Sequence, residues 1–235
     1  MSSSSDLERG LAELGFADPA ALAERFRTFG RELIRANQET NLVGAHSEDQ
    51  LVSAHFLDSL APLAGERLVG PVVDVGSGAG LPGVPVALAF PRLSITLVEP
   101  RTKRAAFLTD VVRSLGLVNV CVDRRSAQTA ARGDLRDAAQ TALARALARP
   151  AMALDLALPL VKPGGRLFLY GGREARLDTT ALDAIARNAS VLVEARPVHV
   201  PYLEAERHVW IVRKQGATPP DLPPSARARR RSASA

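Results

Sequence analysis

The stretch VVDVGSGAGLPGVPVAL, residues 72–88, decides the fold class of this chain. Its first four residues form the kind of apolar run that makes a buried strand, and four glycines follow within eight residues. The apolar residues 81–90 have the composition of a buried helix. Glycines between a strand and a helix let the backbone bend sharply and close on a ligand. The stretch therefore predicts a strand–loop–helix unit that binds a nucleotide-like ligand.

The residues after this stretch continue the alternation of strand and helix, which indicates parallel strands joined by right-handed crossovers. We expect an α/β, Rossmann-like fold with a mostly parallel sheet of about seven strands. The expected strands cover residues 72–75, 94–100, 118–122, 138–143, 166–170, 191–197 and 209–214. The expected helices cover residues 81–90, 102–117, 156–165 and 179–187.

Two amphipathic helices are expected before the sheet. Apolar residues recur at helical spacing in two sets, namely Leu22, Phe26, Phe29 and Leu33, and then Val52, Phe56, Leu60 and Leu63. Ser47 and Gln50 form a capping-box pattern ahead of the second set. The expected organisation is a flexible or helical N-terminus (1–18), a helical segment (19–66), the main domain (67–215) and a disordered basic tail (216–235).

The composition is that of a globular domain with unevenly placed charge. Of the 235 residues 46% are hydrophobic, and no apolar run is long enough to cross a membrane. The net charge of +5 falls to +1 (5 − 4) without Arg227, Arg229, Arg230 and Arg231, so the tail suggests a polyanionic partner. Cys121 is the single cysteine, and we expect neither a disulfide nor a metal site. The first residues lack a signal-peptide pattern, and we expect a cytoplasmic protein.

Two cofactors fit the glycine loop. Residues 78–83 match GxGxxG, and Glu99 ends the next expected strand, as in dinucleotide-binding folds. The loop also matches (D/E)xGxGxG, the form found in enzymes that bind S-adenosylmethionine (AdoMet), with Asp74 as the acid. A pyrophosphate would be repelled by Asp74, whereas the ammonium and sulfonium groups of AdoMet would not. The charge of Asp74 therefore favours AdoMet.

Five stretches give the chain a more specific resemblance. They are TNLVGAHSEDQLVSAHFLDSLAPL (40–63), VVDVGSGAGLPGVPVAL (72–88), TLVEPRTKRAAFL (96–108), LARALARPAMALDLALPLVKPGGRL (143–167) and ERHVWIVRK (206–214). In order and spacing they resemble the bacterial 16S ribosomal RNA guanine-N7 methyltransferase family, also called glucose-inhibited division protein B. The pair HFLDS and DVGSGAGLPG is the most specific part of this resemblance.

The resemblance implies an AdoMet site built on the glycine loop and the ends of the neighbouring strands. The cofactor-binding residues would be Asp74, Gly76, Ser77, Gly78, Gly80, Leu81, Glu99, Ala127, Gln128 and Arg145. Glu99 would accept hydrogen bonds from the ribose hydroxyls. Gln128 stands where the family usually has a glutamate, so it keeps an acceptor but loses the charge.

The resemblance also implies methyl transfer to N7 of a guanine in the 530 loop of 16S rRNA (position 527), as naked rRNA or in the small subunit. N7 carries no proton, so in-line displacement would need alignment rather than a general base. His55 and Asp58 share a helix face and are candidate pocket residues. The candidate RNA-binding residues are Lys103, Arg104, Arg173 and Arg207. We expect a monomer that does not contact membranes.

The residues by themselves leave other functions open. The chain could be an AdoMet-dependent enzyme for another RNA site or a small molecule, a nicotinamide-dependent dehydrogenase, or a non-enzymatic RNA-binding protein. The charge of Asp74 argues against the dehydrogenase, and the basic tail argues against a small-molecule acceptor. A non-enzymatic protein would not need an intact glycine loop.

Overall fold

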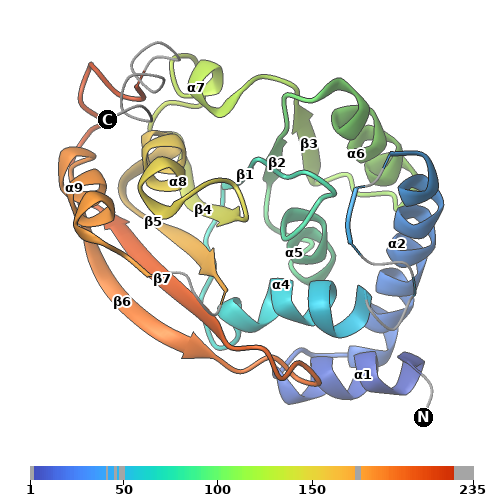
Figure 1. The fold of residues 1–235 in the computed structure, drawn as a ribbon. Helices are drawn as coiled ribbons and strands as arrows, with labels where there is room; N and C mark the ends of the chain where they lie inside the picture. Colours follow the sequence, from blue (N-terminus) through green and yellow to red (C-terminus); the bar gives the residue numbers. More distant parts are fainter. Residues whose placement is uncertain (1–2, 41, 45–46, 48–50, 173–175, 225–235) are drawn as a thin grey trace.

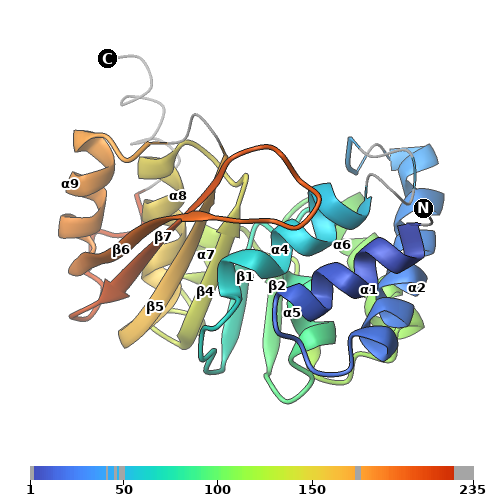
Figure 2. The same cartoon turned by 90° about the horizontal axis from the view of Figure 1, so that it is seen from below.

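Figure 1 shows the computed structural model of the chain, which describes residues 3–40, 42–44, 47, 51–172 and 176–224. A seven-stranded sheet lies between two layers of helices, as Figure 2 shows from below. Gln50 of the expected capping box lies outside the described residues. None of the helices in the described part of the chain is long and apolar enough to cross a membrane.

The elements follow one another in the order expected of a doubly wound fold. The strands are β1 (Val72–Val75), β2 (Ile95–Val98), β3 (Val120–Asp123), β4 (Ala139–Arg145), β5 (Val161–Gly171), β6 (Ser190–Val198) and β7 (Arg207–Lys214). The longer helices are α1 (Ser3–Glu13), α2 (Pro19–Thr40), α5 (Gly83–Ala89), α6 (Thr102–Ser114), α8 (Pro150–Ala157) and α9 (Thr179–Arg187). The short helical turns are η1 (Val52–Leu57), α4 (Asp58–Leu60), η2 (Ala61–Leu63), α7 (Ala127–Ala130) and η3 (Leu158–Leu160).

The strand order places a binding crevice beside β1. The order is β3-β2-β1-β4-β5-β7-β6, and all neighbours are parallel except the pairs that β7 makes with β5 and β6. The chain winds outward from β1 to β3 on one side and then returns to β4 on the other side. In open α/β sheets ligands bind outside the carboxyl ends of the strands at such a switch point. The predicted fold class is confirmed, and it positions a site where β1 and β4 end.

Each face of the sheet buries its own hydrophobic core. On one face, Val72, Ile95 and Leu97 of the sheet pack with α1, α2, η1, α5 and α6. Leu7 and Leu11 of α1 belong to this cluster. Val73 and Val75 point to the opposite face and pack with α7, α8 and α9. The alternation follows from the two-residue period of a strand. Because the N-terminal helices share a core with the sheet, they are built into the main domain.

The helix expected at residues 156–165 is wrong in its bounds. Helix α8 begins at Pro150, a residue that is favoured at the first helical position, and ends at Ala157. Strand β5 already begins at Val161, and Pro163 and the following glycines form a bulge in it opposite Gln140. A Cβ on Gly165 would lie 2.8 Å from the backbone oxygen of Gln140. The Pro-Gly-Gly motif therefore interrupts a strand rather than ending a helix.

The segment 216–224 packs on the domain, so the expected disorder of residues 216–235 was wrong for this part. Arg136 donates to the backbone oxygens of Thr218 and Leu222 at 2.8 and 2.7 Å. Lys214 is fully buried and donates to Oγ1 of Thr218 at 2.7 Å. Burial lowers the pKa of Lys214 to about 8, against the opposing charge of Asp137. Residues 225–235, with the four arginines, lie outside the described residues.

Candidate active site

The glycine loop connects β1 to α5 at the switch point of the sheet. Gly76 and Gly78 have φ angles of 73° and 57°, in the left-handed region that favours glycine. A Cβ on Gly76 would lie 2.4 Å from Cδ1 of Leu147, which follows β4. The loop backbone therefore packs against the side chain of Leu147, which would have to move if Gly76 carried a side chain.

Glu99 follows β2 and fixes the position of the loop. Its side chain is buried, with 3% of the residue exposed. Oε2 accepts a hydrogen bond from the backbone N–H of Gly78 at 2.9 Å, and Oε1 accepts one from the backbone N–H of Arg101 at 2.8 Å. A carboxylate offers about four acceptor sites. Glu99 can therefore accept from a ligand while it continues to hold the loop.

Asp74 in β1 makes a structural contact with the start of α5. It is 1% exposed, and its Oδ2 accepts from the backbone N–H of Gly83 at 3.0 Å. Burial raises the pKa of Asp74 to about 7, although hydrogen bonds from Ser77 and Gly83 oppose this. The carboxyl group therefore holds the start of α5 and is only partly ionised at neutral pH. Its electrostatic preference for a cationic cofactor is weaker than a fully charged aspartate would give.

A cavity of about 230 Å³, called here the loop cavity, lies over the glycine loop. It is lined by Leu42, Val43, His55, Gly76, Ser77, Gly78, Ala79, Leu81, Arg104, Arg145 and Ala146. Apolar side chains and loop backbone make up most of this lining, and no carboxylate is among the described residues that form it. Such a surface suits an adenosine-like ligand that is recognised by shape and backbone contacts.

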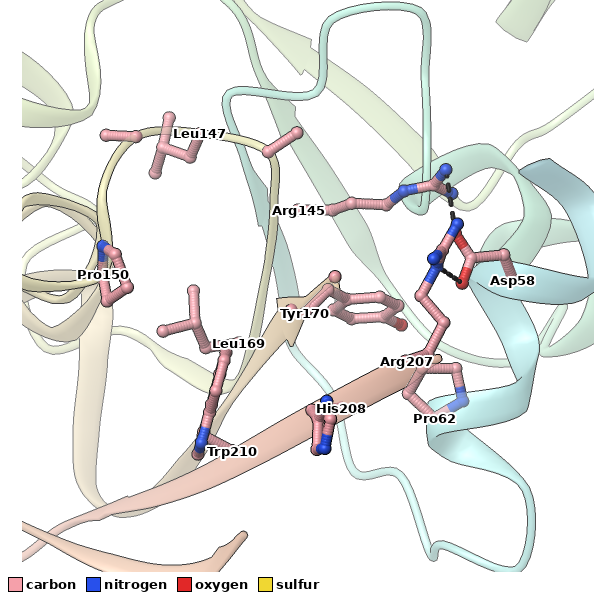
Figure 3. Close-up of a pocket in the computed structure, with 14 residues that line it drawn as sticks. Asp58, Pro62, Arg145, Leu147, Pro150, Leu169, Tyr170, Arg207, His208 and Trp210 are labelled. Carbon is pink, nitrogen blue, oxygen red and sulfur yellow. Dashed lines mark hydrogen bonds and ion pairs between the residues drawn. The ribbon is translucent and has the colours of Figure 1, made fainter. Parts of the chain in front are cut away.

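A second cavity of about 360 Å³, called here the aromatic cavity, lies at the ends of β4 and β5 and the start of β7 (Figure 3). Tyr170, His208 and Trp210 contribute its aromatic side chains, and the rings of His208 and Trp210 stack with centroids 6.4 Å apart. Arg145 and Ala146 line both cavities. The two cavities therefore meet at the end of β4.

Asp58 and two arginines form a charged cluster at this junction. Oδ2 of Asp58 lies 3.1 Å from Nη2 of Arg145, and Oδ1 lies 3.0 Å from Nε of Arg207, as the dashed lines in Figure 3 show. Nη1 of Arg145 also donates to the backbone oxygen of His55 at 3.2 Å and to Oγ of Ser59 at 3.1 Å. His55 and Asp58, which were predicted to share one helix face, both contact Arg145, and so does Ser59.

His55 is a neutral member of this cluster. Burial and, to a smaller extent, the nearby charges of Arg145 and Arg207 together lower the pKa of His55 to about 4. Nη2 of Arg145 lies 3.1 Å from Nδ1 of His55. A guanidinium group can only donate, so Nδ1 must accept and the ring proton must lie on Nε2.

We expect NMR to find His55 as the Nε2–H tautomer, with a pKa of about 4 rather than 6.5. The unfolded chain would bind a proton between these two pH values, so stability should fall as the pH drops from 6.5 towards 4. Long-range ¹H–¹⁵N spectra of the imidazole measure the pKa and the tautomer, and His55→Gln should reduce this part of the pH dependence. Arg145→Gln should raise the pKa of His55, because it removes a nearby positive charge. A charged His55 ring at pH 6 would contradict the assignment.

The structure brings only some of the predicted site residues to the cavity walls. The predicted cofactor residues that line the loop cavity are Gly76, Ser77, Gly78, Leu81 and Arg145. Those that do not line it are Asp74, Gly80, Glu99, Ala127 and Gln128, and their contact with the cofactor stays a prediction.

Three of the four predicted RNA-binding residues are described by the structure, and they differ in their surroundings. Arg104 lines the loop cavity instead of an outer surface, and Arg207 lines the aromatic cavity. Lys103 is exposed at the start of α6, and Arg173 lies outside the described residues. Among the described residues, two of these candidates therefore line the cavities, and Lys103 lines neither of them.

Sequence reasoning missed the aromatic side chains of the second cavity. His208 and Trp210 are two residues apart in β7, so they lie on the same face of the strand. That spacing was a usable signal. Tyr170 gave no such signal, because it pairs with Val209 across β5 and β7, so its side chain lies on the opposite face of the sheet from those of His208 and Trp210.

Solved structures with this fold include methyltransferases. The chain matches a predicted O-methyltransferase from Agrobacterium tumefaciens with a TM-score of 0.54 at 18% identity, over 67% of this chain and 80% of that one. It matches a 16S rRNA (adenine(1408)-N(1))-methyltransferase from Catenulisporales acidiphilia, solved with its cosubstrate SAM, with a TM-score of 0.50 at 18% identity, over 63% and 86%. The fold is therefore the Rossmann-like fold that these methyltransferases share. The family model for rRNA small subunit methyltransferase G matches residues 22–210, and the chain belongs to this family.

Individual relatives match over nearly their whole length. Ribosomal RNA small subunit methyltransferase G of Halalkalibacterium halodurans is 32% identical over 222 residues, which cover 93% of each chain. The protein of the same name from Sorangium cellulosum is 34% identical over 213 residues, which cover 89% of this chain and 87% of that one. The family, the enzyme class and the cofactor predicted from the sequence are therefore confirmed.

Proposed function

We propose that this protein transfers a methyl group from AdoMet to N7 of a guanine in the 530 loop of 16S rRNA. The observation that carries the proposal is the pair of cavities that share Arg145 and Ala146. One cavity lies over the glycine loop, and the other offers aromatic rings and arginines. A methyl donor and a base bound in these two cavities would lie on either side of one short segment.

The loop cavity fits the methyl donor. The glycine backbone leaves open the space that a Cβ on Gly78 would occupy, and Glu99 beside the loop has acceptor capacity for ribose hydroxyls. When bound, AdoMet supplies an electrophilic methyl group on a positively charged sulfur. Gly76, Gly78 and Leu81 would form the floor of its site, and Arg104 would close one side.

The aromatic cavity fits a base that has been turned out of its stack. Tyr170, His208 and Trp210 line this cavity, and bases stack readily on aromatic rings. Nδ1 of His208 is buried without a hydrogen-bond partner among the described residues, and a polar ligand atom could satisfy it. Arg207 at the rim would meet the negatively charged RNA backbone.

The acid–base groups around the two cavities favour an acceptor that has no proton to lose. Among the described residues that line them, Asp58 is the one carboxylate, and both of its oxygens are paired with arginines. Nδ1 of His55 already accepts from Arg145. An exocyclic amine or a hydroxyl would need a base during methylation, whereas the in-plane lone pair of guanine N7 would not.

The remaining parts of the proposal concern how the protein meets its substrate. Both cavities are built by one chain, which supports action as a monomer. Exposed Lys103 and the arginine-rich tail would add RNA affinity by displacing counterions. A ribosomal substrate would place the protein in the cytoplasm.

Methyl transfer to defined RNA tests this function. Labelled AdoMet would be incubated with unmodified 16S rRNA, unmodified small subunits and fully modified subunits as the control. We expect one methyl group per unmodified molecule, and cleavage at N7-methylguanine should map it to the 530 loop. Label at an exocyclic nitrogen, at another loop or equally in the modified control would contradict the proposal.

A further inference from the structure

Asp58 occupies an unusual position for a buried carboxylate. It is 4% exposed and bridges two arginines from different strands, Arg145 at the end of β4 and Arg207 at the start of β7. The side chains of the two arginines are only 16% and 23% exposed. One carboxylate on a helical turn therefore connects the junction of the cavities with the rim of the aromatic cavity (Figure 3).

The charges around this carboxylate do not cancel. Arg145 and Arg207 contribute two positive charges, Asp58 contributes one negative charge, and His55 is neutral above a pKa of about 4. Asp74, which is only partly ionised at neutral pH, also interacts with Arg145, but these four groups by themselves form a cluster with a net charge of +1. Without Asp58 it would carry +2 in a partly shielded place, where charges interact more strongly than in water.

We propose that Asp58 is a positioning residue, which orients Arg145 and Arg207 at the aromatic cavity and cancels one of their charges so that the cavity tolerates a cationic product. The inference rests on the proposed function, because it concerns the base that receives the methyl group. It assigns to the HFLDS motif a role in the chemical step.

The charge balance of methyl transfer explains why this cancellation matters. The N7 lone pair forms the new bond to the methyl carbon, and the electron pair of the breaking carbon–sulfur bond goes to sulfur. No proton moves, and the positive charge passes to the base. Two uncompensated guanidinium groups beside the base would repel the charge that develops on it in the transition state and is absent from the bound base beforehand, so they would slow the chemical step rather than weaken RNA binding.

The test compares Asp58→Asn with a matched control, Asp155→Asn. Asp155 in α8 is 6% exposed and pairs with Nη2 of Arg187 at 2.6 Å, but it lines neither cavity. Both substitutions remove the charge of a buried aspartate that holds an arginine. The measurements are the single-turnover methylation rate, the half-saturating rRNA concentration, the Kd for AdoMet and the melting temperature.

We expect Asp58→Asn to lower the single-turnover rate at least 30-fold, with the half-saturating rRNA concentration unchanged or lower and the AdoMet Kd within threefold of the wild type. Asp155→Asn should lower the melting temperature but leave the single-turnover methylation rate within twofold of the wild type. A rate for Asp58→Asn no lower than that of Asp155→Asn would overturn the inference, as would a loss explained by weaker binding of rRNA or AdoMet. If the wild-type protein itself does not methylate the 530-loop guanine, the proposed function fails instead.

Discussion

We expect Gly78→Asp to weaken AdoMet binding at least 100-fold, about 2.7 kcal/mol, while the protein stays folded. The new Cβ would lie 3.5 Å from Nη1 of Arg104, so the carboxylate would extend into the loop cavity. It would also bring a second negative charge close to Glu99, whose Oε2 accepts from the backbone of residue 78. Isothermal titration calorimetry measures the Kd, and thermal unfolding checks the fold.

Two control substitutions separate the causes of this loss. Gly116 has a φ angle of 61°, and a Cβ there would meet no atom within 4 Å. Gly116→Asp therefore has a similar backbone cost without entering the cavity, and should bind AdoMet normally. Gly78→Asn fills the cavity without the charge and should fall between the two. If the AdoMet Kd of Gly78→Asp were within threefold of that of the wild type, the loop cavity would not be the cofactor site.

We expect Phe56→Ala to lower the free energy of unfolding by about 4 kcal/mol, the range for a fully buried phenylalanine. Phe56 is 1% exposed, and its ring stacks on Phe26 and Phe29 with centroids 5.1 and 5.5 Å away. These contacts join η1 to α2. The polar face of the same helical turn carries His55 and Asp58, so the truncation should also slow methyl transfer. Urea denaturation measures the free energy.

Phe107→Ala makes the same chemical change at a half-buried position on α6. It should lose less than half as much stability, because its ring is already partly hydrated. Neither cavity is lined by Phe107, so its methylation rate should stay close to that of the wild type. If Phe56→Ala cost no more stability than Phe107→Ala, the aromatic stack would not be what holds the helical turn.

Local pattern was sufficient for most of the fold. The apolar run of β1, the glycines after it and the alternation that follows were enough to predict a doubly wound sheet. The pattern failed at residues 156–165, where LALPLV is equally apolar as a helix or as a strand. The register of β5 against β4 decides that question, with Val161 opposite Ala139. The segment 216–224 was also missed, because the backbone oxygens that bind Arg136 leave no mark in the composition.

The sequence by itself determined the family, the cofactor and the position of the glycine loop, because each depends on residues close together along the chain. Only the tertiary structure decided what the side chains do. In the folded chain, Asp74 accepts a hydrogen bond from Gly83. Arg145 and Arg207, from two distant strands, both pair with the carboxylate of Asp58. The physical reason is that burial and ion pairing depend on which segments meet in space, and this is set by the strand order of the sheet rather than by spacing along the chain.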